Sequence, residues 1–189
     1  MKPTREQAYA LLVEYNDSPA LITHALAVEG VMRHFARTLG EDEEKWGVIG
    51  LLHDLDYQRF PEQHCTKVRE ILTERGVDEE YIHAIQSHGY GLCSDVKPEH
   101  VMEKVLYTID ELTGLINATA IMRPSKSVLD LELKSVKKKY KDRSFAAGVN
   151  REVIEKGTAM LGMSLDDVIT ETIAGMRDVA DAIGLRGNL

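Results

Sequence analysis

The sequence predicts an all-α fold, a single-domain bundle of about seven or eight helices. Three observations support this prediction. Apolar residues recur at intervals of three and four along most of the 189 residues, and no stretch alternates between apolar and polar residues as a half-buried strand does. Glycine and proline stand at the ends of the periodic stretches, where helices start and stop. Because 43% of the residues are hydrophobic, the chain can bury a sizeable core.

Four helices are expected in the first half of the chain. Residues 16–40 begin with cap-type residues and an early proline, and their apolar positions keep a steady three–four spacing. Residues 41–54 open with acidic residues, which stabilise a helix N-terminus. A loop around Pro61 comes next, followed by helical patterns over 63–76 and 77–89 that each end on a glycine.

Four more helices are expected in the second half. A long helix should run from Pro98 to about Met122, and its mostly apolar composition makes it the central buried helix. A short helix is expected within 128–140 and another over 150–162. The last one, 164–184, starts with a capping-box pattern and stops at a glycine.

The composition of the chain limits its domain organisation and the kinds of partner it can bind. We expect one domain over residues 1–189, with a core at about 16–123 and C-terminal helices 128–184 packed on it. The net charge of −8 argues against binding to nucleic acid polymers or anionic membranes. No stretch approaches the roughly 20 apolar residues that span a bilayer, and no signal-peptide core is visible. Cys65 and Cys93 are too few for a disulfide framework and lack zinc-knuckle spacing, so we expect a cytoplasmic protein; a homo-oligomer is compatible with these features.

Several histidines and aspartates fall where the apolar pattern predicts core. Burying an imidazole or a carboxylate without a partner costs free energy, so each needs a hydrogen bond, a salt bridge or a metal ion. An acid in the middle of an apolar helix is the costliest to bury unless it faces a cation. Because separate helices contribute these side chains, a shared metal site explains them better than independent coincidences. They are His24, His53, Asp54, His64, His88 and Asp110.

The mixture of imidazole and carboxylate indicates which metals fit. These ligands suit divalent Mn, Fe, Co, Ni or Zn, and the absence of cysteine from the set argues against a structural zinc site. Adjacent helical residues point about 100° apart, so His53 and Asp54 converge on one ion only if they flank it or if the helix ends there. The other histidines, His34, His83 and His100, are assigned structural roles.

The order of these residues resembles the HD superfamily of metal-dependent phosphohydrolases. Its H…HD…D pattern matches at four positions, and two further histidines resemble those of its dinuclear subgroup. The stretches THALAVE, GLLHDLDY, ELTGLI and RPSK are similar to stretches of small stand-alone bacterial and archaeal members, and the likeness extends to about residue 150. The four matching positions are His24, His53, Asp54 and Asp110, and the two histidines are His64 and His88.

Two departures limit what the resemblance implies about the substrate. The family often has Gly-Lys shortly after the His-Asp pair, where this chain has Asp56 and Tyr57. The segment SHGYG also differs from the signature of cyclic-di-GMP phosphodiesterases. The resemblance therefore implies an HD-domain-like fold and a reaction class, and leaves the substrate open.

The implied reaction is hydrolysis of a phosphate ester or phosphoanhydride of a small, nucleotide-like molecule by metal-activated hydroxide. The cofactor would be one or two divalent ions among Fe, Mn, Co, Ni, Zn and Mg. Asp54 would be the central catalytic residue, because it would bridge two ions. By this resemblance one ion would be held by His24, His53, Asp54 and Asp110, and a second by Asp54, His64 and His88.

A basic segment follows the predicted central helix. Residues 123–143 contain eight basic and three acidic residues in an otherwise acidic chain. Arg123 and Lys126 come directly after the helix that carries Asp110, so we expect them to bind the substrate phosphate, the arginine with a planar fork and the lysine as a point charge. The lysines further along the segment are expected to form a solvated face.

Two other functions fit the same residues. A di-iron oxygenase would use the same ligand set on the same scaffold. A non-catalytic binding or signalling module would keep the fold without turnover, although an intact ligand set counts against it.

Overall fold

The structure, a computed structural model, describes residues 1–189 and is entirely helical, with nine α-helices and one short 3₁₀ helix, η1. The predicted all-α fold class is therefore confirmed. None of the helices is both long enough and apolar enough to cross a membrane. The elements are α1 (Arg5–Tyr15), α2 (Pro19–Leu39), α3 (Glu43–Leu52), η1 (Pro61–Gln63), α4 (Lys67–Glu74), α5 (Glu79–Ser87), α6 (Val101–Ile121), α7 (Leu133–Lys141), α8 (Arg151–Leu161) and α9 (Leu165–Asp178).

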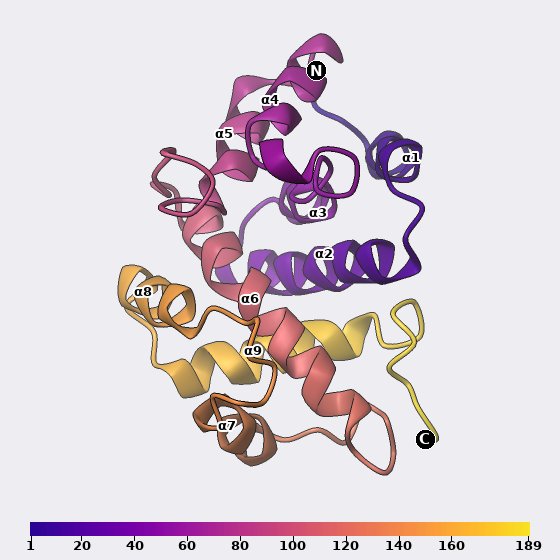
Figure 1. Cartoon of the computed structure of the whole chain (residues 1–189), viewed down its shortest axis with the longest axis vertical. Coiled ribbons are helices and arrows are strands. Elements are labelled where there is room, and N and C mark those ends of the chain that lie inside the picture. The colour runs from indigo at the N-terminus through magenta and orange to yellow at the C-terminus, as the bar shows by residue number, and fades with distance from the viewer.

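Helix α2 lies in the middle of the molecule (Figure 1). In that view α1, α3, α4 and α5 lie on one side of it, and α7, α8 and α9 lie on the other. Helix α6 packs against α2, α7, α8 and α9, so it joins the C-terminal helices to the rest of the fold. One continuous apolar core runs through both halves.

Two glycines let other helices approach α2 closely. A Cβ atom added at Gly50 of α3 would lie 3.1 Å from the carbonyl oxygen of Val28, and one added at Gly175 of α9 would lie 2.7 Å from the Cα atom of Val31. The distance at Gly175 is shorter than real Cβ contacts, so α9 depends on the missing Cβ to seat against α2. The distance at Gly50 is tight enough that the neighbouring atoms would have to shift by a few tenths of an ångström to admit a Cβ.

The boundaries differ from the expected ones at several places; α4, for example, begins at Lys67 and not at residue 63. Helix α1 was not expected, because only Ala8, Leu11 and Leu12 of its residues are buried and its apolar stripe is short. Helix α6 begins at Val101, where His100 accepts a hydrogen bond from the backbone and caps the helix. Helix α9 ends near residue 178, and the following turns reach the expected stop at residue 184.

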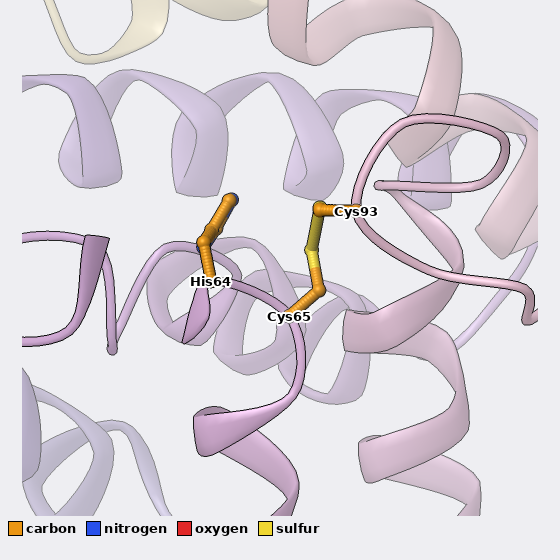
Figure 2. A group of neighbouring side chains, drawn as sticks. All are labelled: His64, Cys65 and Cys93. Atoms are coloured by element: carbon orange, nitrogen blue, oxygen red, sulfur yellow. A yellow bond between two sulfur atoms is a disulfide. The ribbon is translucent and has the colours of Figure 1, made fainter. Parts of the chain in front are cut away.

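Cys65 and Cys93, too few for a disulfide framework, form one disulfide with each other (Figure 2). Their Cα atoms are 5.9 Å apart, within the range that a disulfide can bridge. The cysteines are 28 residues apart in sequence, and only the folding of the turn before α4 against the loop after α5 brings them together. Spacing along the chain carries no sign of this approach.

Candidate metal centre

Two histidines and two aspartates converge from three helices. His24 comes from α2 and Asp110 from α6, and His24 Nε2 lies 2.8 Å from Asp110 Oδ1. Helix α3 ends at Leu52, so His53 caps it and Asp54 lies in the turn that follows. Since the helix ends there, the adjacent pair can point at one place: His53 Nε2 lies 3.2 Å from Asp54 Oδ2 and 3.2 Å from Asp110 Oδ1.

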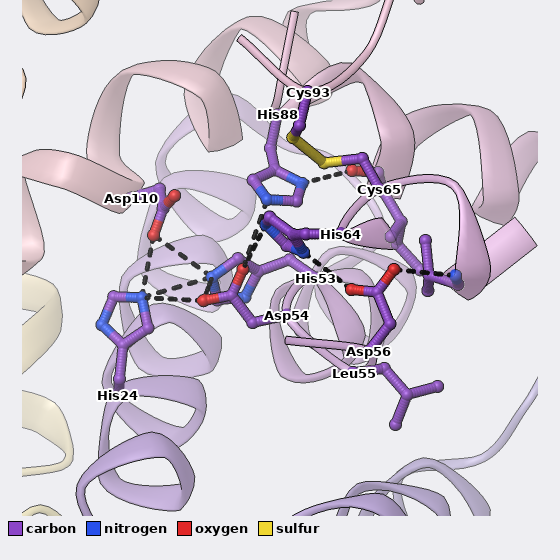
Figure 3. Close-up of polar contacts among 12 residues, drawn as sticks. His24, His53, Asp54, Leu55, Asp56, His64, Cys65, His88, Cys93 and Asp110 are labelled. Carbon is purple, nitrogen blue, oxygen red and sulfur yellow. Dashed lines mark hydrogen bonds and ion pairs between the residues drawn. A yellow bond between two sulfur atoms is a disulfide. The ribbon is translucent and has the colours of Figure 1, made fainter. Parts of the chain in front are cut away.

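A second group forms on the other side of the Asp54 carboxylate. Its Oδ1 atom lies 3.4 Å from His64 Nε2 and 3.3 Å from His88 Nε2. Its Oδ2 atom instead faces His53 and His24, whose Nε2 is 3.7 Å away. The two oxygens of one carboxylate therefore face two different sets of histidines, and Figure 3 shows this arrangement. The structure thus brings all six residues predicted as metal ligands into one cluster.

Local hydrogen bonds orient the imidazole rings. His53 and His88 are the C-cap residues of α3 and α5, and each ring turns back so that its Nδ1 bonds to a carbonyl oxygen of the preceding turn, that of Gly50 at 2.7 Å and that of Ile85. A carbonyl oxygen only accepts, so these contacts assign the proton to Nδ1. When the ring is neutral, its Nε2 atom therefore carries a lone pair that points into the cluster.

Asp56 orients the third ring, and it is a residue that the sequence reasoning missed. Its side chain is fully buried; Oδ1 accepts a hydrogen bond from His64 Nδ1 at 2.7 Å, and Oδ2 accepts one from the backbone N–H of Val68 at 2.8 Å. A carboxylate behind a metal-binding histidine holds the ring in place and raises its basicity. An acid in an apolar run, two residues after the His-Asp pair, was the available signal.

The electrostatics of the cluster fit a bound cation. Burial disfavours a protonated His53, but Asp54 and Asp110 outweigh burial, and the pKa of His53 lies well above its ordinary value. Burial likewise disfavours a charged Asp110, but the histidines around it hold its pKa far below the usual range. Carboxylate oxygens and imidazole nitrogens packed this closely need either protons or a metal ion between them. The ligand atoms form two groups, each within 4.8 Å, and Asp54 belongs to both.

The cluster opens into a cavity of about 480 Å³. This volume suits a small molecule. Tyr57 and Tyr107 line it, and Glu111 is its one charged side chain outside the six clustered residues. Burial raises the pKa of Glu111, whose carboxylate accepts a hydrogen bond from the backbone N–H of Asn150 at 2.9 Å.

Arg123 and Lys126 are not brought to this cavity. Helix α6 continues from residue 110 to Ile121, which carries the chain roughly 16 Å along the helix axis away from the cluster. The guanidinium of Arg123 pairs with Asp130 at 3.2 Å, and Lys126 is exposed. Neither residue lines the cavity, so their role in phosphate binding stays a prediction without a supporting contact.

The three histidines assigned structural roles lie outside the cluster. His34 pairs with Glu171 at 2.5 Å, His83 pairs with Glu103, and His100 caps α6. The first two contacts each join two helices, α2 to α9 and α5 to α6, and the third stabilises the start of α6.

A family profile for the HD domain matches residues 21–137, more than half of the chain. The chain belongs to the HD domain family. No curated protein and no solved structure matches the chain. The HD match runs from α2 into α7 and includes the whole cluster. HD domains are typical of metal-dependent phosphohydrolases, and this one carries His and Asp groups that can hold divalent metal ions.

Proposed function

We propose that this HD-domain protein is a metal-dependent phosphohydrolase that cleaves a phosphate ester or phosphoanhydride of a small molecule. The observation that carries the proposal is the position of Asp54, with one oxygen toward His24 and His53 and the other toward His64 and His88. A carboxylate placed in this way is suited to bridge two cations.

The proposed ligands divide into two sets. His24, His53, Asp54 and Asp110 would hold one ion, and Asp54, His64 and His88 would hold the other. Two divalent ions, when bound, supply a water of lowered pKa and positive charge for the oxygens of a phosphoryl group. Mn, Fe, Co, Ni, Zn and Mg remain the candidate ions.

The protein's own residues contribute position and environment. His53 is fully buried and held by the carbonyl of Gly50, so its ring cannot turn away from the cluster. Asp56 does the same for His64 through a buried hydrogen bond. Ligands fixed before the substrate arrives need no reorganisation during the reaction, which is the main source of electrostatic catalysis.

We also infer that the chain acts as one domain. Helices α8 and α9 pack directly on α6 and α2, the two helices that carry Asp110 and His24. The C-terminal helices would thus support the two ligand-bearing helices, and Val153 of α8 also lines the cavity. A cytoplasmic location stays a prediction.

Metal analysis of anaerobically purified protein, followed by a phosphate-release screen with Mn²⁺ or Fe²⁺, tests the proposal. We expect about two ions per chain and phosphate release from at least one small phosphate ester. Metal-loaded protein that is inert across a broad panel would instead identify a binding or signalling module. Turnover that requires dioxygen, with a mixed-valent iron signal, would identify a di-iron oxygenase.

A further inference from the structure

The cavity beside the cluster contains no lysine or arginine. Its carboxylates are Asp54, Asp110 and Glu111. Two divalent cations would exceed these three negative charges by about one positive charge, which offsets between half and two thirds of the charge of a single phosphate group, about −1.5 to −2. A polyphosphate would bring further negative charges that no side chain of the lining neutralises. The charge of the cavity therefore favours a substrate with one phosphate.

Nearby basic residues do not change this balance. Arg143 lines a separate hollow, which shares Val149 with the cavity. The guanidinium of Arg151 is buried and donates to the carbonyl oxygens of the chain before α8, among them that of Tyr140 at 2.8 Å and that of Phe145 at 2.6 Å. Neither arginine is among the residues that line the cavity.

Glu111 is held as an acceptor at the wall of the cavity. It follows Asp110 on α6, so the two side chains point about 100° apart and reach different parts of the site. Its Oε2 accepts the backbone N–H of Asn150, the N-cap residue of α8, at 2.9 Å. Its Oε1 makes no hydrogen bond within the protein. One oxygen is thus anchored and the other is free to bind a ligand.

The surroundings of Glu111 leave room for the organic part of a small substrate. Gly114 lies one turn further along the same face of α6, and a Cβ atom added there would meet nothing closer than Val149, 4.0 Å away. Leu92, 63% exposed, adds an apolar side chain to the lining. A short carbon chain that carries a hydroxyl or an amine fits between these side chains.

We propose that Glu111 determines specificity by accepting a hydrogen bond from a hydroxyl or amine of the substrate, and that the substrate is the monophosphate ester of a small alcohol bearing such a group. The inference rests on the proposed hydrolase function, because the phosphate is taken to lie at the clustered histidines and aspartates. Glu111 recognises the alcohol part of the substrate, and the clustered histidines and aspartates bind its phosphate.

Binding of phosphonates to the Mn²⁺-loaded protein tests this inference without turnover, since their carbon–phosphorus bond is not a hydrolysable ester. The probes are ethylphosphonate, 2-hydroxyethylphosphonate, 2-aminoethylphosphonate, inorganic phosphate and ATP, measured by calorimetry. We expect the hydroxyl or the amine probe to bind about tenfold more tightly than ethylphosphonate, a difference of about 1.4 kcal/mol. The stronger of the two identifies the donor.

Variants assign that preference to the carboxylate. Glu111→Ala should bring the ratio of dissociation constants close to one, and Glu111→Gln, which keeps shape and the bond to Asn150, should give an intermediate ratio. Glu41→Gln, at an exposed site just past the C-terminal end of α2, is the matched control and should keep the ratio of the unaltered protein.

Four results would overturn the inference. Equal binding of all phosphonates, or the same ratio in Glu111→Ala, would remove the role of Glu111 and leave the hydrolase proposal standing. Tighter binding of ATP than of every single-phosphate probe would show that the charge argument fails. No binding of any probe, inorganic phosphate included, would count against both the inference and the proposed function.

Discussion

At the scale of single residues, the site depends on how each side chain is held. The Asp54 carboxylate lies between two sets of histidines, and only a carboxylate has two equivalent oxygens with which to face both. His53, His64 and His88 are each fixed by a hydrogen bond from Nδ1, which leaves Nε2 directed at that carboxylate. Substitutions here change chemistry more than they change packing.

Asp54→Asn should lose at least one bound metal ion and nearly all hydrolysis. The amide keeps the size of the carboxylate but removes its charge and one of its two ligating oxygens. Metal content by elemental analysis and phosphate release are the measurements, with Asp181→Asn as the control because Asp181 is 77% exposed. A fully active Asp54→Asn protein with unchanged metal content would contradict the bridging role.

Asp56→Asn should weaken the second ion selectively. The amide no longer offers a charged acceptor to His64 Nδ1, so the ring loses its fixed orientation. Losing such a supporting carboxylate typically costs 10- to 100-fold in metal affinity, about 1.4 to 2.7 kcal/mol. Titration of the metal-free protein should show one site weakened and one retained. Two unaltered sites would show that Asp56 only caps α4.

At the scale of elements, helix ends place the site. Helices α3 and α5 stop where His53 and His88 begin, and the disulfide joins the turn before α4 to the loop after α5. The disulfide therefore fastens together the two segments that carry His64 and His88 (Figure 3).

Reduction of the Cys65–Cys93 disulfide should lower the free energy of unfolding by about 2–4 kcal/mol, because the bond closes a loop in the unfolded chain. Urea denaturation with and without a dithiol reductant measures the change. The double variant Cys65→Ala, Cys93→Ala should show no change in stability when reductant is added. This control separates the effect of breaking the disulfide from other effects of the reagent. An unchanged midpoint for the reduced protein would rule out this contribution.

At the scale of the whole molecule, the stability of the metal-free protein should depend on pH through its buried cluster. The pKa values of His53 and His88 are raised. Their contribution to the free energy of unfolding is therefore fully present below about pH 6.5 and is lost as pH rises through the raised values. The pKa values of Asp54 and Asp110 are lowered, so their contribution is present above about pH 4 and is lost on further acidification.

Melting temperatures at pH 6 and pH 8.5 test this dependence. With a chelator, the melting temperature should fall by several degrees between the two values. With Mn²⁺ it should hold or rise, because metal ligands must be deprotonated and the ion then replaces the protons. A metal-free protein that becomes more stable at pH 8.5 would contradict the assignment of raised histidine pKa values.

Much of the fold followed from local patterns, and the exceptions have physical causes. Helix α6 was expected because a long apolar stretch is visible in sequence, whereas α1 buries only a short stripe and gives little signal. Asp56 orients a ring eight residues away, and the proposed role of Glu111 depends on the start of α8 beside it. Arg123 was expected near the phosphate from its place in the chain, but the length of α6 carries it away from the cavity.

The sequence by itself determined the helical class, the HD pattern and the six residues that meet in the cluster, because periodicity and residue type are local properties of the chain. Only the tertiary structure decided that the oxygens of Asp54 face two different histidine sets, that Cys65 meets Cys93, and that the cavity lacks basic side chains. These features depend on where helix ends and loops meet in space. Packing of the whole core determines which helix ends and loops come into contact, and the spacing of residues along the chain does not encode these contacts.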